Sequence, residues 1–175
     1  KYFEMRRFVD IIKIIQRSNI KIAVLGDLIL DHYIFGRVHR ISPEAPVPIV
    51  DSEFEKNNMG GAGNAIMNIS NLGIKAIPVG VVGNDHIGKI LKKLLLENKI
   101  DIDNVVFSPN SSTTHKTRII ADNQQVVRVD WDNNSIDNDS KVLKFEQLPF
   151  ELKNHSNNLI KLDVQRAELK VLDGL

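Results

Sequence analysis

The feature that most constrains the fold of this chain is a buried strand that ends in carboxylates, followed by a glycine-rich helix start. Residues 22–25 are an uninterrupted apolar run, and Gly26, Asp27 and Asp31 follow it. Residues 60–64, Gly-Gly-Ala-Gly-Asn, then open a helical pattern. In an open α/β sheet these two features lie at the same rim, where ligands bind. The sequence therefore predicts a polar, polyol-sized site at the rim of an α/β sheet.

The order of the expected elements indicates a parallel sheet. Residues 21–26 predict a central strand, and residues 61–72 predict a helix that stops at Gly73. A second strand is expected at 74–82, before a periodic helix at 87–98 that Asp85 caps. Strands that alternate with helices are typical of a parallel sheet covered on both faces. An amphipathic helix, rather than a signal sequence, is expected at 3–15 because its apolar residues recur at helical spacing.

The pattern changes in the second half of the chain. Two β-branched runs, 114–121 and 125–131, flank the turn residues Asp122 and Asn123 and predict a hairpin. Two strands are not stable alone, so the hairpin is expected to join the extended segment 47–54 in a small second sheet. Prolines restrict that segment to an edge or its first residues. Residues 132–140 are expected to be a linker or loop, and the remaining residues to 175 form a weakly helical, unassigned tail.

Composition excludes several classes of function. The 175 residues have 42% hydrophobic and 26% charged content with a net charge of +1, which is ordinary for a soluble globular protein. Lysine and arginine are scattered, so no nucleic-acid partner is expected. The chain has no cysteine, which excludes disulfides and thiolate zinc sites and suits the cytoplasm. No apolar stretch reaches the length of a membrane span, and the five histidines have no metal-ligand spacing.

Two carboxylates, Asp27 and Asp31, are candidate ligand groups. They could equally cap the structure that follows the first strand, since aspartate is common at such positions. In the functional interpretation, a carboxylate accepts hydrogen bonds from two adjacent sugar hydroxyls, which neutral acceptors do less well. We favour Asp31 for this role.

The glycine-rich segment has two misleading interpretations besides a plain tight turn. A dinucleotide-binding fingerprint would need a third glycine where Ile66 stands, and no acidic ribose partner follows. The segment also imitates an anion hole, but Asn64 stands where a basic carboxylate would be required. One feature of the segment still favours a binding site. Gly60 and Gly61 have no side chains, so a ligand can approach the backbone closely beside the amide of Asn64.

Residues 83–90 imitate a phosphate-binding P-loop. The spacing of glycines and lysine matches, but the final position is Ile90 and cannot ligate Mg²⁺ as serine or threonine would. Asp85 would in addition repel phosphate. We therefore interpret the segment as a structural turn from strand to helix.

The predicted hairpin carries polar residues that suit a phosphorylated ligand. Gln124 and Gln125 could be ordinary turn residues, or they could present several donors and acceptors to one ligand. Arg118 and Arg128 lie on the two flanking strands, and guanidinium groups suit a phosphate already present on a substrate.

Three stretches give the chain a family resemblance over about residues 20–131: the glycine-rich segment 60–83, the string Arg-Ile-Ser-Pro-Glu-Ala-Pro-Val-Pro at 40–48, and the hairpin 117–128. Together they resemble the N-terminal half of ribokinase-like (PfkB) carbohydrate kinases, and among these the heptose-7-phosphate kinases of lipopolysaccharide-core precursor synthesis. The segment departs from the family signature at Ile66, where a small residue is usual.

The resemblance implies a partial three-layer α/β/α sandwich with a small β-sheet lid at about 38–56 and 112–131. It implies phosphorylation of a sugar phosphate, with heptose 7-phosphate as the expected substrate and with ATP and Mg²⁺ as cofactors. Residues 1–131 would be the sugar-binding half and 132–175 the linker and tail. No catalytic or metal-binding residue is expected in this chain, because the family's base and nucleotide-binding half follow further along the sequence. The implied substrate-binding residues are Asp27, Asp31, Gly60, Gly61, Asn64, Arg118, Gln124, Gln125 and Arg128.

A homodimer formed through the lid is also expected, because the apolar lid residues Val47, Ile49, Ile119 and Val127 would otherwise be exposed. The alternative from a different functional class is a non-catalytic module that binds a sugar phosphate or forms oligomers. The sequence downstream of Leu175 would distinguish the two.

Overall fold

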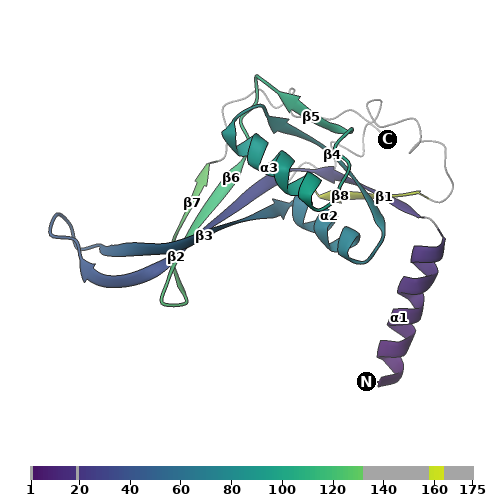
Figure 1. Ribbon diagram of the computed structural model, residues 1–175, viewed down its shortest axis with the longest axis horizontal. Helices are drawn as coiled ribbons and strands as arrows, with labels where there is room; N and C mark the ends of the chain where they lie inside the picture. The colour runs from purple at the N-terminus through teal and green to yellow at the C-terminus, as the bar shows by residue number, and fades with distance from the viewer. Residues whose placement is uncertain (1, 19, 132–157, 164–175) are drawn as a thin grey trace.

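The computed structural model describes residues 2–18, 20–131 and 158–163, and it contains two four-stranded sheets (Figure 1). The first sheet has the strand order β5-β4-β1-β8 and is parallel throughout. The second has the order β3-β2-β6-β7 and is mixed. This arrangement confirms the predicted α/β fold with a parallel sheet and a separate small sheet.

The parallel sheet is built around β1 (Lys21–Gly26), whose neighbours are β4 (Lys75–Gly83) and β8 (Asn158–Asp163). Strand β5 (Val105–Ser108) completes the sheet beside β4. The continuous apolar run of β1 is explained by this central position, since Ala23, Val24 and Leu25 are at most 3% exposed. The prediction of a central buried strand is therefore confirmed.

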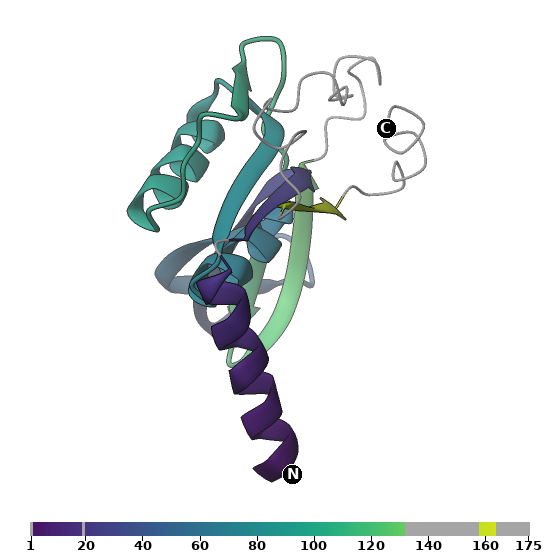
Figure 2. The same cartoon turned by 90° about the vertical axis from the view of Figure 1, so that its right-hand side faces the viewer.

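Two crossover helices pack on the parallel sheet. Helix α2 (Ala62–Asn71) connects β3 to β4, and α3 (His86–Glu97) connects β4 to β5. Gly73 follows α2 with φ 74°, as expected of a residue that stops a helix. Both helices lie on one face, because right-handed connections that step in one direction across a sheet place their helices on the same side (Figure 2). Helices α2 and α3 thus cover one face of the sheet, and cover of the other face stays a prediction.

The core lies between these helices and the sheet. Its largest fully buried side chains come from both layers and from the start of the second sheet, which fixes the place where the two sheets join. They include Val24, Leu30, Ile66, Leu91 and Leu95. Burial of this apolar surface stabilises the junction at about 25 cal/mol per Å².

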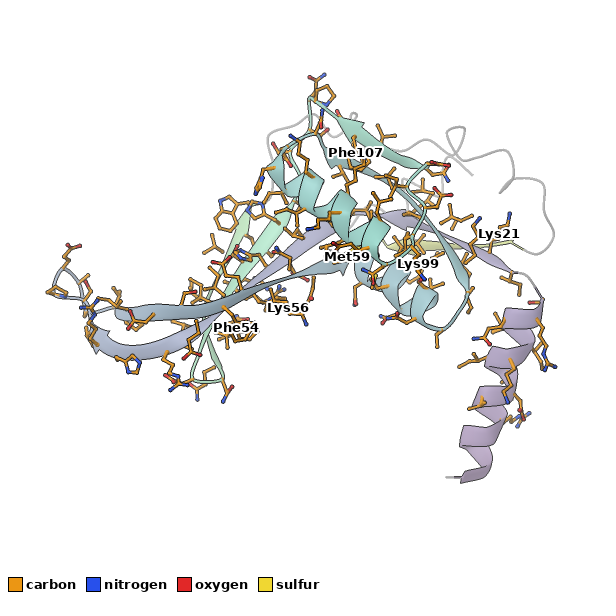
Figure 3. The ribbon with its side chains drawn as sticks, in the orientation of Figure 1. Lys21, Phe54, Lys56, Met59, Lys99 and Phe107 are labelled. Atoms are coloured by element: carbon orange, nitrogen blue, oxygen red, sulfur yellow. The ribbon has the colours of Figure 1, made fainter. Side chains whose placement is uncertain are left out.

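The second sheet begins with two long antiparallel strands, β2 (Leu28–Ile41) and β3 (Pro48–Gly61). They project from the body as an arm, with Phe54 and Lys56 along it and Met59 at its base (Figures 1 and 3). Strand β6 (His115–Ala121) pairs with β2 in parallel, and β7 (Gln124–Trp131) pairs with β6. The hairpin and residues 47–54 thus share a sheet as predicted, with β3 at its edge, but the unpredicted strand β2 lies between them.

The hairpin turn is fixed against the arm. Asp122 and Asn123 have φ values of 50° and 65°, the left-handed conformation that a two-residue hairpin turn requires. The backbone N–H of Asp122 donates to the carbonyl of Gly36 at 3.2 Å, and its carboxylate accepts from the N–H of Val38 at 3.3 Å. A side chain at Gly36 would lie 2.3 Å from the carbonyl oxygen of Asp51, so only glycine permits this close approach.

Helix α1 (Tyr2–Arg17) precedes the sheet and confirms the expected amphipathic helix. It extends away from the body in both views (Figures 1 and 2). The side chain of Gln16 donates to the carbonyl of Leu72, which connects the end of α1 to the end of α2. None of the helices that the structure describes is long and apolar enough to cross a membrane.

Strand β8 corrects the sequence analysis. Residues 158–163 lie in the segment for which a weak helical pattern was expected, and they instead form a parallel strand beside β1. The rest of the predicted linker and tail, residues 132–157 and 164–175, lies outside the described residues.

Candidate functional site

The candidate site forms where β1 passes into β2 and β3 passes into α2. The carbonyl of Asp27 accepts a hydrogen bond from the N–H of Ala62 at 3.0 Å, which joins the two passages. Gly61 has φ 53°, and a side chain there would lie 2.5 Å from the same carbonyl oxygen. Glycine is therefore required at position 61 both by its backbone conformation and by the space available.

A carboxylate lies directly over bare backbone at this junction. A side chain at Gly60 would lie 2.5 Å from Oδ2 of Asp31, so the Asp31 carboxylate occupies the space that Gly60 leaves open. Asp31 and Gly60 come from the neighbouring strands β2 and β3. The glycine thus permits close packing of a carboxylate against the chain, as well as ligand approach.

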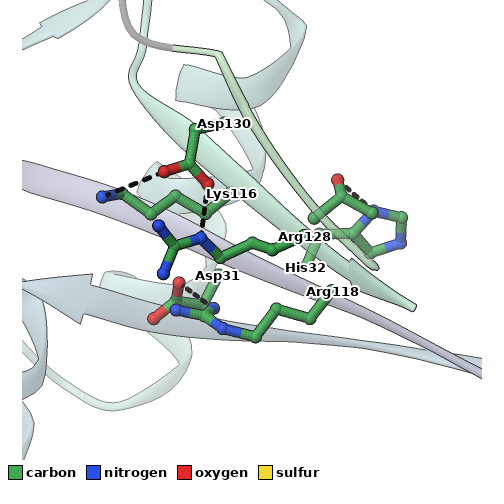
Figure 4. Close-up of polar contacts among 7 residues, drawn as sticks. Asp31, His32, Lys116, Arg118, Arg128 and Asp130 are labelled. Carbon is green, nitrogen blue, oxygen red and sulfur yellow. Dashed lines mark hydrogen bonds and ion pairs between the residues drawn. The ribbon is translucent and has the colours of Figure 1, made fainter. Parts of the chain in front are cut away.

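The Asp31 carboxylate is held by Arg118 of β6. The guanidinium donates to Oδ1 of Asp31, and both side chains are about four-fifths buried, at 21% and 18% exposure (Figure 4). The guanidinium also lies 5.3 Å from the ring centre of Tyr33. The hydrogen bond to Asp31 raises the pKa of Arg118, although burial opposes the charged form. Arg118 therefore orients the carboxylate that we expect to bind hydroxyl groups.

A second charged group lies beside this pair. Asp130 of β7 accepts from Nε of Arg128 at 2.9 Å and lies 3.7 Å from Nζ of Lys116 (Figure 4). Alternation along the paired strands places Asp31, Lys116 and Asp130 on one face of the sheet. Three cationic side chains therefore face two carboxylates there, and the excess positive charge favours an anionic ligand group.

A pocket of about 490 Å³ adjoins this charged face. Asp31 and Asn64, two of the predicted residues, line it, and Asn64 is the third residue of α2. The lining is otherwise mainly neutral and polar, with residues from β2, β3, α2 and α3. Its residues are Asp31, Tyr33, Asn57, Asn58, Met59, Asn64, Met67, Asn68, Asn71, Leu94 and Asn98.

The predicted residues are brought together to different degrees. Asp31, Gly60, Asn64 and Arg118 surround one junction, whereas Gln124 and Gln125 are exposed at the start of β7, opposite Ala121 and Ile120. Neither glutamine lines the pocket. The ligand roles of all these residues stay predictions.

Several neighbours of the site were not predicted from the sequence, among them Tyr33, Lys116 and Asp130. Tyr33 belongs to β2, which was not identified as a strand. Residues 28–35 do not alternate polar and apolar side chains, so the two-residue periodicity that places Asp31, Tyr33 and Phe35 on one face gave no clear signal.

In the segment that imitates a P-loop, residues 83–90, the carboxylate of Asp85 caps the helix that follows. Asp85 caps α3 by accepting from the N–H of Gly88 at 2.7 Å, and its other oxygen accepts from the N–H of Thr113 at 2.7 Å. Burial opposes the charged form of Asp85, but the hydrogen bonds from Thr113 and Gly88 outweigh it, so its pKa is lowered. A carboxylate thus occupies the helix N-terminus where a P-loop would hold phosphate.

Comparison with known families assigns this chain to the carbohydrate kinases. The chain matches the pfkB family of carbohydrate kinases over residues 19–155, and it belongs to that family. It is 46% identical over 118 residues to the Bifunctional protein HldE of Sulfurimonas denitrificans, which covers 67% of this chain and 25% of that protein. It is 48% identical over 110 residues to the HldE of Helicobacter pylori, covering 63% and 24%. The chain thus spans about a quarter of the length of these curated relatives.

Solved structures show the same fold. A carbohydrate kinase from Agrobacterium tumefaciens matches with a TM-score of 0.52 and 23% identity, over 63% of this chain and 35% of that one. A ribokinase from Arabidopsis thaliana, complexed with ribose and ATP, matches with a TM-score of 0.51 and 19% identity, over 63% and 35%. The fold is therefore a partial ribokinase-like fold, as predicted.

Kinases of this family use ATP and Mg²⁺. The loop at residues 83–90 does not fit a nucleotide phosphate, because the Asp85 carboxylate lies at the start of α3 and already accepts from the N–H of Gly88. Among the described residues, no group of three or more histidines and carboxylates could hold a metal ion.

Proposed function

We propose that this chain binds the sugar-phosphate acceptor of a cytoplasmic heptose-phosphate kinase, the enzyme class that phosphorylates heptose 7-phosphate with ATP during lipopolysaccharide-core precursor synthesis. The observation that carries the proposal is the Asp31 carboxylate, which lines the pocket and is held by Arg118 over the bare backbone of Gly60. The similarity to HldE proteins supports heptose rather than ribose as the sugar.

The role of the described residues is to bind and orient. Asp31 accepts hydrogen bonds from adjacent hydroxyls, and the amide of Asn64 both donates and accepts beside it. Arg118, Arg128 and Lys116 supply the positive charge that a substrate phosphate needs. An acceptor hydroxyl held in one orientation reacts faster because its translational and rotational freedom is already lost. No phosphoryl-transfer step follows from the described residues themselves.

Calorimetry of the 175-residue chain with heptose 7-phosphate tests the proposal. Saturable binding is expected, and it should be weaker for the same heptose without its phosphate. Arg118→Gln should remove most of that difference, because the glutamine keeps a hydrogen bond to Asp31 but lacks the charge. Arg37→Gln is the matched control, since Arg37 pairs with Glu53 at 2.8 Å on the exposed arm. Absence of binding by the unaltered chain would refute the proposal.

We also propose that two copies associate through the second sheet. Strand β7 is an edge strand of that sheet, and Val126, Val127, Val129 and Trp131 along it are 38% to 47% exposed. An exposed apolar edge favours pairing with another chain. Association through β7 would also suit the alternative function, a non-catalytic module that binds a sugar phosphate or forms oligomers.

A further inference from the structure

We propose that helix α1 (Tyr2–Arg17) binds the surface of an anionic membrane and lies in the plane of the lipid head groups. The helix takes no part in the proposed sugar-phosphate site. Its exposed apolar side chains, its charge and its place in the molecule all favour a membrane as the partner.

Apolar side chains of α1 are exposed to solvent. Val9, Ile11 and Ile14 are 42%, 48% and 65% exposed. At about 3.6 residues per turn, the positions of Val9 and Ile14 bound a mainly apolar arc that also contains Ile11, Ile12 and Ile15. This arc covers more than half of the helix circumference. Exposed apolar surface of such breadth is typical of a contact site.

A second copy of the helix would not cover this arc. Two paired helices bury a narrow seam, which in coiled coils repeats over at least about three heptads. Helix α1 has 16 residues, or about two heptads. Val9 lies nearly opposite Ile11 on the helix, so one seam cannot contain both. A lipid surface, in contrast, covers a broad face because the helix sinks into it.

The polar face of α1 is basic. Asp10, Lys13 and Arg17 are three and four residues apart, which places them on one face, and all three are exposed. Over the whole helix, four arginine and lysine residues stand against two acidic ones, which gives a net charge of +2. The long side chain of Arg7, whose position lies within the apolar arc, can extend its charged end to the head groups. A helix with this distribution is complementary to a membrane that contains anionic lipids.

The position of α1 leaves it accessible to a membrane. The helix extends away from the body in both views (Figures 1 and 2). The hydrogen bond that joins it to the body, from Gln16 to the carbonyl of Leu72, lies in its last turn. The arm formed by β2 and β3 lies at the opposite end of the molecule (Figure 1). The helix can therefore meet a membrane without displacing the arm.

Flotation of the 175-residue chain with lipid vesicles tests the proposal. The chain should bind vesicles of phosphatidylcholine and phosphatidylglycerol in equal parts about tenfold more tightly than vesicles of phosphatidylcholine alone. The double variant Ile11→Gln and Ile14→Gln should lower the affinity for the mixed vesicles about tenfold, because two apolar side chains no longer enter the lipid. Both isoleucines are exposed, so the body should fold as before. Leu96→Gln is the matched control, since Leu96 is 51% exposed on α3.

The double variant Lys13→Gln and Arg17→Gln tests the role of charge. It should weaken binding to the mixed vesicles and leave binding to phosphatidylcholine alone unchanged. Failure of the unaltered chain to bind the mixed vesicles would overturn the proposal, as would equal binding by the isoleucine variant. A chain that does not bind vesicles but forms dimers that the isoleucine variant abolishes, as sedimentation velocity would show, would assign α1 to a second copy instead.

Discussion

Arg118 and Asp31 form a largely buried ion pair between β6 and β2, although 87 positions separate them in the sequence. The pair joins the hairpin to β2, the strand that follows the first strand of the parallel sheet, and so links the lid to the body. Such a pair contributes most by fixing geometry, because desolvation offsets much of the attraction between the charges. Loss of one partner leaves the other charged and poorly solvated.

Substitution of either of two polar residues of the pocket lining, Asp31 and Asn64, should weaken ligand binding. Asp31→Ala and Asn64→Ala should each reduce the affinity for heptose 7-phosphate by roughly 1–3 kcal/mol, because each leaves polar ligand groups unpaired. Asp31→Ala should also lower thermal stability, since it leaves the guanidinium of Arg118 without its carboxylate. Calorimetry and a melting curve measure the two effects. Unchanged affinity in both variants of a chain that binds would remove the site assignment.

Gly60→Ala should impair binding with little effect on folding. The new methyl group would meet Oδ2 of Asp31 at 2.5 Å, and a carboxylate at the end of a side chain can move aside. That movement takes Asp31 away from Arg118 and from the pocket. Gly88→Ala is the contrasting variant, because its methyl group would meet the carbonyl of Gly83 at 1.9 Å and the backbone itself would have to shift. Equal affinities of Gly60→Ala and the unaltered chain would contradict this account.

Much of the fold could be predicted because its signals are local. The apolar run of β1, the stop at Gly73 and the cap at Asp85 each depend on a few consecutive residues, and each lies where the sequence places it. Strand β2 was not predicted, because polar and apolar side chains alternate only weakly around Asp31, His32 and Tyr33. Strand β8 was not predicted, because its parallel pairing with β1 is a contact between segments that are distant in the sequence.

The sequence predicted which residues belong to the candidate site better than it predicted which of them are in contact. Glycines and carboxylates at a strand end are recognisable by type, so Asp31, Gly60 and Asn64 were identified. The partner of Asp31 was not, because parallel pairing of β2 with β6 sets which residues meet and no local pattern encodes that register. Gln124 and Gln125 lie on an exposed edge, since turn residues and ligand-binding residues share the same polar composition.

The carboxylate of Asp85 should stabilise the fold in a pH-dependent way. Its folded-state pKa is lowered below the ordinary value of 3.8, so its contribution is present above that value and is lost as the pH falls through the folded-state pKa. Asp85→Ala should lower the free energy of unfolding at pH 7 by about 1 kcal/mol through the lost helix cap. The difference between the two chains should shrink toward pH 3, as urea denaturation at both pH values would show.

Asp103→Ala is the control for this experiment, because it removes an exposed carboxylate from a loop near the other end of α3. A variant of Asp85 whose destabilisation stayed constant between pH 7 and pH 3 would contradict the role of its charge.

Association through the lid should depend on β7. Val127 is 42% exposed and pairs with Ile119 across the hairpin, so Val127→Lys places a charge on the apolar edge without disturbing the core. Sedimentation velocity should show a dimer for the unaltered chain and a monomer for the variant. A monomer of the unaltered chain with an ordered hairpin at high dilution would count against the dimer.

The chain of 175 residues should not turn over ATP at the rate of a kinase. Phosphoryl transfer needs a positioned base, Mg²⁺ held against the phosphates and donors for the developing charge. The loop at residues 83–90 cannot supply the phosphate site, because Asp85 already accepts from the N–H groups of Gly88 and Thr113. In a coupled assay with heptose 7-phosphate and Mg-ATP, ADP release should stay at the background rate. Sustained turnover that Lys89→Ala abolishes would instead show that this loop binds the nucleotide.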